Sequence, residues 1–336
     1  MAAPWPARAL DAWLPARTHP ETYPGERPAG SYLLIGDEVR PLDVRAPDDI
    51  RVFGPAGAVE RLDGLLTREG LPPVADRVAV LAYGANRNPG TLGIKLRNYG
   101  YRSPGRAVAL PMLRGRVAGA DVVACALSGQ GYFFGDLIVE PELTARTSAE
   151  VWIGLLDAEQ LRVMHDSEIA TGDYVAAVVP GVTVEPFDGE LGVLGYAARA
   201  RCVVSPELGT PIAFVGIEAT NRAIPAMSPM QMLDHLAGAF GLTALLRAAA
   251  GLGNDGDFAV ELSRFMNGNW WLQFRKTGLP DPGYLDVLRL FADRVRESAL
   301  PESTADRLES RGLTLTTEQA YRPPSTLTWG THRAML

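Results

Sequence analysis

The chain has 336 residues, of which 47% are hydrophobic and 21% charged, a composition typical of a globular protein with one large or two modest domains rather than of a disordered chain. Its net charge of -7 at pH 7, with no basic run, argues against a nucleic-acid-binding surface. Because no apolar stretch approaches the ~18 residues of a membrane span, and the first residues lack the apolar core of a signal peptide, we expect a cytoplasmic protein with no membrane partner.

Residues 1–75 are predicted to form an N-terminal arm followed by a helix. Residues 1–30 are rich in proline and polar groups, which favours an extended arm. Apolar side chains then recur at helical spacing over residues 58–70 and stop at Gly70, which is typical of a helix end. We expect this region to cover the core rather than to take part in catalysis.

An apolar strand is predicted over residues 78–82, followed by a turn and then a helix. The turn has the sequence Tyr83-Gly84-Ala85-Asn86-Arg87. Asn88 is a preferred N-cap and Pro89 a preferred first helical residue, so residues 91–97 should continue the helix. The first amides of such a helix have no intrahelical partner and could hold a carboxylate or a developing oxyanion at the turn. The same pattern also fits an ordinary strand-to-helix connection with a well-formed cap.

No cofactor-binding motif accompanies this turn. Gly90 is not followed by the Lys-Ser/Thr pair of a phosphate loop, and the third glycine of a dinucleotide fingerprint is missing. Cys125 and Cys202 are far apart without a CxxC partner, the 4 histidines have no metal-ligand spacing, and no serine has the Gly-x-Ser-x-Gly surroundings of a nucleophile. We therefore expect no metal, nucleotide or redox cofactor, and we expect Cys125 to pack in the core.

A second block, residues 151–174, is predicted to form a strand, a helix and an acidic loop. Apolar residues alternate over residues 151–155 as in a half-buried strand, and Asp157 followed by Gln160 is a capping-box variant that opens a helix. After the loop, Tyr174 begins an apolar strand rich in valine.

Glu168 falls just beyond this predicted helix, where a carboxylate between two strands can be held in position. The alternative is a solvated loop carboxylate, because most carboxylates are exposed and because Asp166 and Asp173 lie nearby. We interpret His165 as a packed or hydrogen-bonded side chain and leave it out of the mechanism.

Together these blocks resemble a known family. Tyr83-Gly84-Ala85-Asn86 after a hydrophobic strand resembles the Tyr-Gly-Ser-Asn loop of the gamma-glutamylcyclotransferase-like (AIG2-like) superfamily. Residues 151–174, in which Glu168 precedes Tyr174, are similar to that family's strand, helix and acidic loop, and residues 110–115 and 121–123 are similar to its connecting strands. The resemblance covers residues 78–182. It implies an α+β fold, with a small mixed β-barrel or sheet and surrounding helices as a core over residues 76–205.

The activity that the resemblance implies is intramolecular aminolysis of a small gamma-glutamyl amide, which releases 5-oxoproline and a free amine or amino acid. Glu168 would be the general base and then the general acid, a role best served by a pKa that partial burial raises. The amides of the loop from Tyr83 to Asn86 would hold the oxyanion and the substrate oxygens. Ala85 replaces the serine of the family, so a hydroxyl contact is lost while the amide remains.

Tyr174 and Arg87 complete the substrate site that the resemblance implies. The Arg87 guanidinium could grip a substrate carboxylate with two hydrogen bonds, but the same residue also fits a solvated position on the first helical turn. A different interpretation is a catalytically inactive member of the same fold that binds a small amide or a partner protein through the cleft. A Glu168 carboxyl that faces the Gly84 turn across a cavity favours the enzyme, whereas one that faces bulk water favours the binding protein.

Residues 206–336 are predicted to form a C-terminal helical extension. Ser228 followed by Gln231 is a capping box, with proline at the first helical position. The predicted helices cover residues 229–239, 242–250, 257–266, 283–299 and 302–310. Residues 267–274 combine aromatic and amide side chains, as in a hydrophobic plug that docks the extension on the core or, alternatively, in an exposed binding site.

Overall fold

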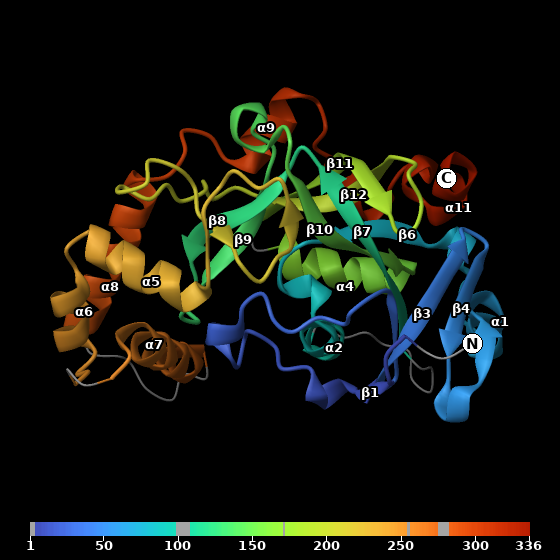
Figure 1. The fold of residues 1–336 in the computed structure, drawn as a ribbon, viewed down its shortest axis with the longest axis horizontal. Coiled ribbons are helices and arrows are strands. Elements are labelled where there is room, and N and C mark those ends of the chain that lie inside the picture. Colours follow the sequence, from blue (N-terminus) through green and yellow to red (C-terminus); the bar gives the residue numbers. More distant parts are fainter. Residues whose placement is uncertain (1–3, 99–107, 171, 254–255, 275–281) are drawn as a thin grey trace.

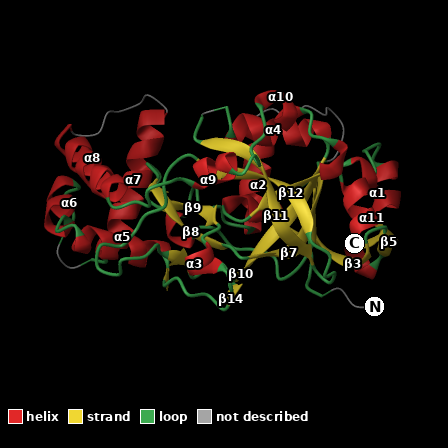
Figure 2. Ribbon diagram, turned by 90° about the horizontal axis from the view of Figure 1, so that it is seen from above, coloured by secondary structure: helices red, strands yellow, loops and turns green. Residues whose placement is uncertain are grey.

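The structure is a computed structural model that describes residues 4–98, 108–170, 172–253, 256–274 and 282–336. It combines a large mixed sheet, a smaller sheet and helices, so the predicted α+β class is confirmed. The N-terminal strands lie at one end of the molecule and the helices of residues 229–297 at the other, whereas the last helix lies beside the N-terminal strands (Figure 1). The middle strands of the large sheet lie between these ends (Figure 2). Within the described ranges, no helix is both long and apolar enough to cross a bilayer.

The centre of the molecule is a set of strands whose pairings form a closed cycle. These strands are β6 (Val78–Ala82), β7 (Ala109–Ala118), β10 (Ser148–Leu156), β11 (Tyr174–Val184) and β12 (Leu191–Ala198). β10 pairs with both β6 and β7, and β11 pairs with both β7 and β12, in each case antiparallel. A parallel contact between β12 and β6 completes the cycle.

The pleat of these strands sorts their side chains into two cores. Leu81 and Ile153 belong to one hydrophobic cluster, whereas Trp152 packs in a second cluster with α2 (Pro89–Asn98) and α4 (Ala158–Glu168). The sequence predicts β10 to be half-buried, and this is wrong. Nearly every residue of β10 is buried, because one of its faces packs in the first cluster and the other lies under the two helices.

The N-terminal region extends the large sheet rather than only covering it. β2 (Tyr32–Ile35) pairs with β7, then β3 (Glu38–Ala46), β4 (Asp49–Phe53) and β5 (Val59–Arg61) follow outward, and β1 (Arg8–Ala9) pairs with β3. The predicted helix begins only at Leu62, as α1 (Leu62–Arg68), because residues 59–61 pair with β4. Strands from the predicted N-terminal region (residues 1–75) and from the predicted core (residues 76–205) therefore pair in one sheet.

A smaller sheet joins the strand cycle to the C-terminal helices. β8 (Asp121–Leu127) pairs with β9 (Phe133–Ile138) and with β13 (Ala213–Phe214), which pairs with β15 (Ala226–Met227). The short α3 (Pro141–Thr144) follows β9, and β14 (Ala219–Thr220) pairs with β10 of the large sheet. Residues from the predicted extension therefore take part in both sheets.

The C-terminal helices form close to where they were predicted. They are α5 (Pro229–Ala239), α6 (Thr243–Ala249), α7 (Phe258–Phe274), α8 (Pro282–Glu297) and α9 (Thr304–Ser310), followed by α10 (Thr317–Tyr321) and α11 (Trp329–Met335). The predicted capping box of Ser228 and Gln231 opens α5. Residues 267–274 continue α7 instead of forming a separate segment, and the side chains of residues 271–274 lie outside those described.

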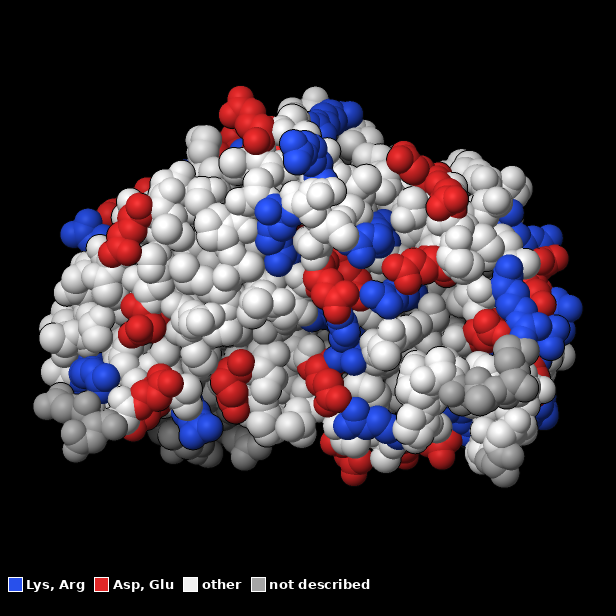
Figure 3. Space-filling model, in the orientation of Figure 1, with Lys and Arg blue, Asp and Glu red and all other residues white. Residues whose placement is uncertain are grey.

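Charged side chains are spread over the surface that Figure 3 shows. Acidic and basic side chains are interspersed on this face rather than gathered by sign, and wide uncharged areas separate them toward the C-terminal helices. Mixed charges of this kind produce no strong field of one sign on the face that is viewed.

Candidate active site

The predicted strand, turn and helix of the first motif are present. β6 runs through Tyr83 and Gly84 into the short 3-10 turn η5 (Ala85–Arg87) and then into α2. Asn88 caps α2, since its Oδ1 accepts a hydrogen bond of 2.8 Å from the amide of Thr91. The cap and the helix that it starts are therefore confirmed.

The N-terminal arm covers the beginning of α2. A Cβ placed on Gly90 would lie 1.9 Å from the carbonyl oxygen of Trp13, so the two backbones are in direct contact. The side-chain amide of Asn88 also donates hydrogen bonds to the carbonyls of Leu14 and Glu26. The arm is thus packed directly against the first turn of α2. The turn that precedes the helix remains as the candidate.

That turn presents backbone donors to a cavity. The amides of Gly84, Ala85 and Asn86 have no hydrogen-bond acceptor among the residues that the structure describes. All three residues line a cavity of about 230 Å³. Pockets for drug-sized ligands measure roughly 300–1,000 Å³, so this one suits a smaller molecule with groups that accept hydrogen bonds.

Separate stretches of the chain build the wall of this cavity. The arm, the turn, one face of α2, the end of α4 and the strands β9, β11 and β12 all contribute to it. Lining residues outside the turn are Arg17, Tyr23, Leu81, Ala82, Thr91, Ile94, Lys95, Gln130, Tyr132, Phe134, Gly135, Glu168, Tyr174 and Tyr196. The fold therefore brings together six of the seven predicted site residues: Tyr83, Gly84, Ala85, Asn86, Glu168 and Tyr174.

Glu168 is buried and its carboxylate meets the predicted turn. Oε1 accepts a hydrogen bond of 3.0 Å from the side-chain amide of Asn86, and the same oxygen forms an ion pair with the ammonium of Lys95. The interpretation of Glu168 as a solvated loop carboxylate is therefore wrong. Glu168 is also the last residue of α4 rather than part of the loop beyond it, so the helix fixes its position.

The acidity of Glu168 differs from the expectation. Burial by itself raises the pKa of Glu168, but the charge of Lys95 and the hydrogen bond from Asn86 outweigh burial and hold this pKa below its ordinary value. The sequence predicted the opposite direction, because it gave no reason to place a cation beside Glu168. Lys95 is one of the chain's two lysines, the other being Lys276. Its spacing from Thr91 predicts only that the two side chains share one face of the helix.

The N-terminal arm closes one side of the cavity, a contribution that the sequence did not indicate. Tyr23 stacks on Tyr132 with ring centroids 4.7 Å apart, and its hydroxyl oxygen accepts a 2.6 Å hydrogen bond from the Gly135 amide. A Cβ on Gly84 would lie 3.0 Å from this hydroxyl. Glycine at position 84 therefore leaves room for Tyr23 to approach the turn.

Tyr83 separates this cavity from a second one of about 370 Å³, whose wall includes Tyr83, Tyr196 and Asp136. The Tyr83 hydroxyl lies 2.7 Å from Oδ1 of Asp136 and also contacts the carbonyl of Tyr196. The hydroxyl is thus held by groups inside the protein, and the Tyr83 ring forms part of the cavity wall.

Arg87 does not reach the cavity. Its side chain is buried and lies near Glu150, with 3.8 Å between Nη1 and Oε2, and it contacts the carbonyl of Gly216. Arg27 and Arg114 pair with the same buried Glu150. Neither the predicted contact with a substrate carboxylate nor a solvated position fits this arrangement, so we leave Arg87 out of the candidate site.

His165 has partners on both ring nitrogens. Nε2 lies 2.8 Å from the carbonyl of Ala320, which can only accept, so Nδ1 accepts the 3.1 Å hydrogen bond from the Tyr196 hydroxyl. Its interpretation as a hydrogen-bonded side chain is confirmed.

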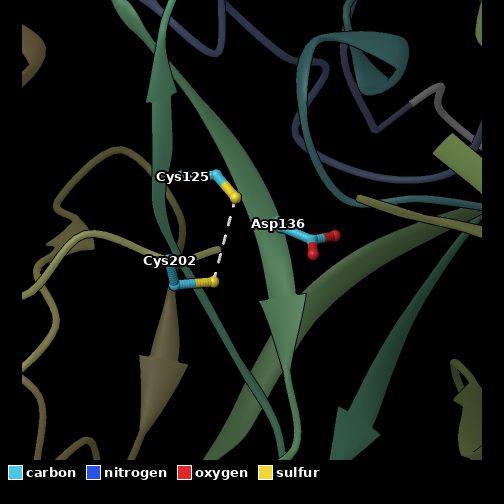
Figure 4. Close-up of side chains that lie close together, drawn as sticks. All are labelled: Cys125, Asp136 and Cys202. Carbon is cyan, nitrogen blue, oxygen red and sulfur yellow. Dashed lines mark hydrogen bonds between the residues drawn. The ribbon is translucent and has the colours of Figure 1, made fainter. Parts of the chain in front are cut away.

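The fold also brings Cys125 and Cys202 together, which their spacing did not suggest. The two sulfur atoms are 4.0 Å apart, and the ligand atoms of Cys125, Cys202 and Asp136 all lie within 4.8 Å of one another. Figure 4 shows the carboxylate of Asp136 turned away from the sulfur atoms. The thiol of Cys125 donates to the carbonyl of Ala200 at 2.8 Å, and Asp136 accepts from the amide of Ala198 at 3.2 Å. These groups therefore already have hydrogen-bond partners within the protein.

Comparison with known proteins adds no assignment. No protein-family model matches the chain, and no curated protein matches it. The chemistry of the cavity is therefore the basis on which a function is proposed.

Proposed function

We propose that the protein is a gamma-glutamylcyclotransferase-like enzyme, which cleaves a gamma-glutamyl amide by intramolecular aminolysis to give 5-oxoproline and a free amine or amino acid. One observation carries this proposal. The buried carboxylate of Glu168 and the backbone amides of Gly84, Ala85 and Asn86, which have no acceptor among the described residues, lie on the wall of one cavity. The resemblance of the sequence pairs these same two elements.

We also infer that the closed cycle of β6, β12, β11, β7 and β10 is the small mixed barrel that the resemblance implies. Its combination of one parallel pairing with antiparallel ones supports this. Asn86, in the turn after β6, donates a hydrogen bond to Glu168 at the end of α4, so these two elements meet at the cavity.

The reaction begins with proton transfer to Glu168. Because the pKa of Glu168 lies below its ordinary value, the carboxylate is ionised at neutral pH and accepts a proton from the substrate's α-ammonium. The freed amine attacks the γ-carbonyl carbon, which forms the new C–N bond of the ring. The cavity favours ring closure by holding the two groups in contact.

The amides of the turn then stabilise the oxyanion of the tetrahedral intermediate, a contribution of about 3 kcal/mol for a well-placed donor. As the carbonyl re-forms, the original amide C–N bond breaks and Glu168 passes its proton to the departing nitrogen. Ring closure releases a second proton from the attacking nitrogen, and this proton ends on the free amine, which is an ammonium at neutral pH.

The proposal is tested by incubating the purified protein with a panel of gamma-glutamyl amides and measuring 5-oxoproline. Glu168→Gln keeps the shape of the side chain and removes the proton carrier, so we expect turnover to fall at least ~100-fold with the melting temperature little changed. Glu159→Gln, which neutralises a partly exposed carboxylate outside the cavity at the other end of α4, is the matched control and should keep full activity. Undiminished turnover by Glu168→Gln would exclude this residue from the mechanism.

The rival function is a catalytically inactive protein of the same fold that binds a small amide. The ion pair of Lys95 with Glu168 favours it, because the carboxylate already has a cationic partner. Calorimetric binding of a gamma-glutamyl amide without any release of 5-oxoproline would support the rival and contradict the enzyme.

A further inference from the structure

We propose that Lys95 binds the α-carboxylate of the substrate, so that Lys95 and Glu168 together recognise the carboxylate and the ammonium that share one carbon atom. This inference rests on the proposed function and names the part of the substrate that the site selects. It also gives a substrate-binding role to a residue that the sequence did not single out.

The position of Lys95 is set by α2. Thr91, Ile94 and Lys95 are spaced three and four residues apart and line the cavity together. The Lys95 ammonium contacts Oε1 of Glu168, and its side chain is 19% exposed. An ammonium has three N–H donors, and in the part of the chain that the structure describes Glu168 is the acceptor found for Lys95. Donors therefore remain for a ligand in the cavity.

The charges of this pair match an α-amino acid. If Glu168 takes a proton from the α-ammonium, the α-carboxylate, which is attached to the same carbon, must lie close to Glu168. Lys95 is in contact with Glu168. Arg17 also lines the cavity, but its charge acts on Tyr132, and Arg87 lies outside the cavity. The carboxylate therefore has its partner at Lys95, and the amides of the turn stay available for the γ-carbonyl oxygen.

Binding of the substrate carboxylate at Lys95 should also change the pKa of Glu168, the proposed base. In the free protein the charge of Lys95 holds the pKa of Glu168 down. A carboxylate on Lys95 offsets that charge, so the pKa of Glu168 should rise when the substrate is bound and Glu168 should become a stronger base. The acid limb of kcat, which reports the complex, should then lie at higher pH than that of kcat/KM, which reports the free enzyme.

The experiment compares two substrates that carry the same leaving amine. One is a gamma-glutamyl amide and the other is the corresponding 4-aminobutyryl amide, which lacks the α-carboxylate and cyclises to 2-pyrrolidinone. A hydrogen bond to a charged group is worth about 1.5–3 kcal/mol, so the wild type should prefer the first substrate by roughly 10- to 150-fold in kcat/KM. Lys95→Met should abolish that preference and also the separation of the two acid limbs.

The controls separate recognition from structure. Arg97→Met removes an exposed cation from the same helix and should keep the preference, and Lys95→Arg should restore part of it. Equal losses for both substrates in Lys95→Met would mean that Lys95 acts only through Glu168, and would overturn the inference.

If the wild type releases neither lactam, the proposed function fails, and calorimetry with the two amides then decides the inference. Tighter binding of the carboxylated amide to the wild type than to Lys95→Met supports it, and equal binding contradicts it. Should Lys95→Met fail to fold, as judged by its melting curve, Lys95→Gln takes its place in both measurements.

Discussion

Asp136 carries a fully buried carboxyl group that lines the second cavity and lies near the cysteine pair. Burial raises the pKa of Asp136 from 3.8 to about 6, although hydrogen bonds from Tyr83 and Ala198 oppose this rise. A carboxyl whose folded-state pKa is raised favours the folded protein while it is protonated. That contribution is fully present below the unfolded pKa and is lost as the pH rises through the folded pKa.

We therefore expect wild type to lose stability relative to Asp136→Asn as the pH rises from 4 to 7. The pKa difference between 3.8 and about 6 corresponds to about 3 kcal/mol in the free energy of unfolding. Denaturant melts of both proteins at several pH values measure it, and the constant effect of the altered hydrogen bonds cancels in the comparison. A stability difference independent of pH, or one that grows in favour of the wild type, would contradict the raised pKa.

Single residues were predictable where their surroundings are local. The turn from Tyr83 to Asn86 follows from a short motif, and the cap at Asn88 needs only the next three residues. Arg87 was misjudged because its partner, Glu150, comes from a strand far along the chain. The spacing of Thr91 and Lys95 indicates that they share one helix face, but it does not indicate that this face meets Glu168.

At the scale of elements, the contact between the arm and α2 holds one wall of the cavity. Alanine in a helix is more favourable than glycine by ~1 kcal/mol, so Gly90→Ala would be stabilising if propensity alone decided. The carbonyl oxygen of Trp13 lies only 1.9 Å from the position of the added Cβ, so the arm must move instead. The arm also carries Arg17 and Tyr23 to the cavity.

We expect Gly90→Ala to destabilise the protein by ~1–3 kcal/mol, to lower its turnover and to increase protease cleavage within residues 1–30. Gly64→Ala is the matched control, because Gly64 lies in α1 with nothing within 4 Å of an added Cβ. It should raise stability by up to ~1 kcal/mol. Melting curves and limited proteolysis make the comparison, and equal gains for the two variants would show that the arm does not pack on α2 as described.

Helices proved easier to predict than strands, for a physical reason. Three helices of the C-terminal region, α5, α9 and α10, begin at capping boxes such as Ser228 with Gln231 and Ser303 with Asp306. In these boxes the residues that stabilise the helix end lie three positions apart. β3 and β4 were not predicted, because they are stabilised by pairing within the extended sheet rather than by a local signal. For the same reason residues 59–61 joined β4 instead of α1.

At the scale of the whole molecule, the C-terminal helix packs against the N-terminal strands. Trp329, at the start of α11, is fully buried, and its indole N–H donates to the carbonyl of Pro47 at 3.2 Å. Its backbone amide donates to the carbonyl of Arg77, just before β6, at 2.7 Å. The last helix therefore connects the N-terminal sheet to the strand cycle.

Trp329→Ala should accordingly lower the free energy of unfolding by about 3–5 kcal/mol, the usual loss for a buried tryptophan. Met335→Ala, on the exposed side of the same helix, should change it by no more than about 0.5 kcal/mol. Denaturant unfolding followed by tryptophan fluorescence and by circular dichroism measures both. A loss below 1 kcal/mol for Trp329→Ala would mean that α11 is not part of the cooperative structure.

The α+β class could be inferred from the whole sequence, but the closed cycle of strands could not. Apart from that of the consecutive strands β11 and β12, the pairings in the cycle join strands that are distant in the chain. The parallel contact of β12 with β6 joins the first strand of the cycle to its last. The resemblance supplied the expectation of a barrel-like core. The extension of the sheet by β2 to β5 lies outside the region that the resemblance covers.

Separate stretches of the chain form the cavity wall, so one stretch can change in evolution while the others stay the same. Glu168, Lys95 and the turn, which are proposed to act on the glutamyl part, belong to the central strands and their helices, whereas Arg17 and Tyr23 come from the arm. New side chains in the arm can therefore reshape one side of the cavity while Glu168 and Lys95 stay unchanged. Substrate range and chemistry are in this way open to separate selection.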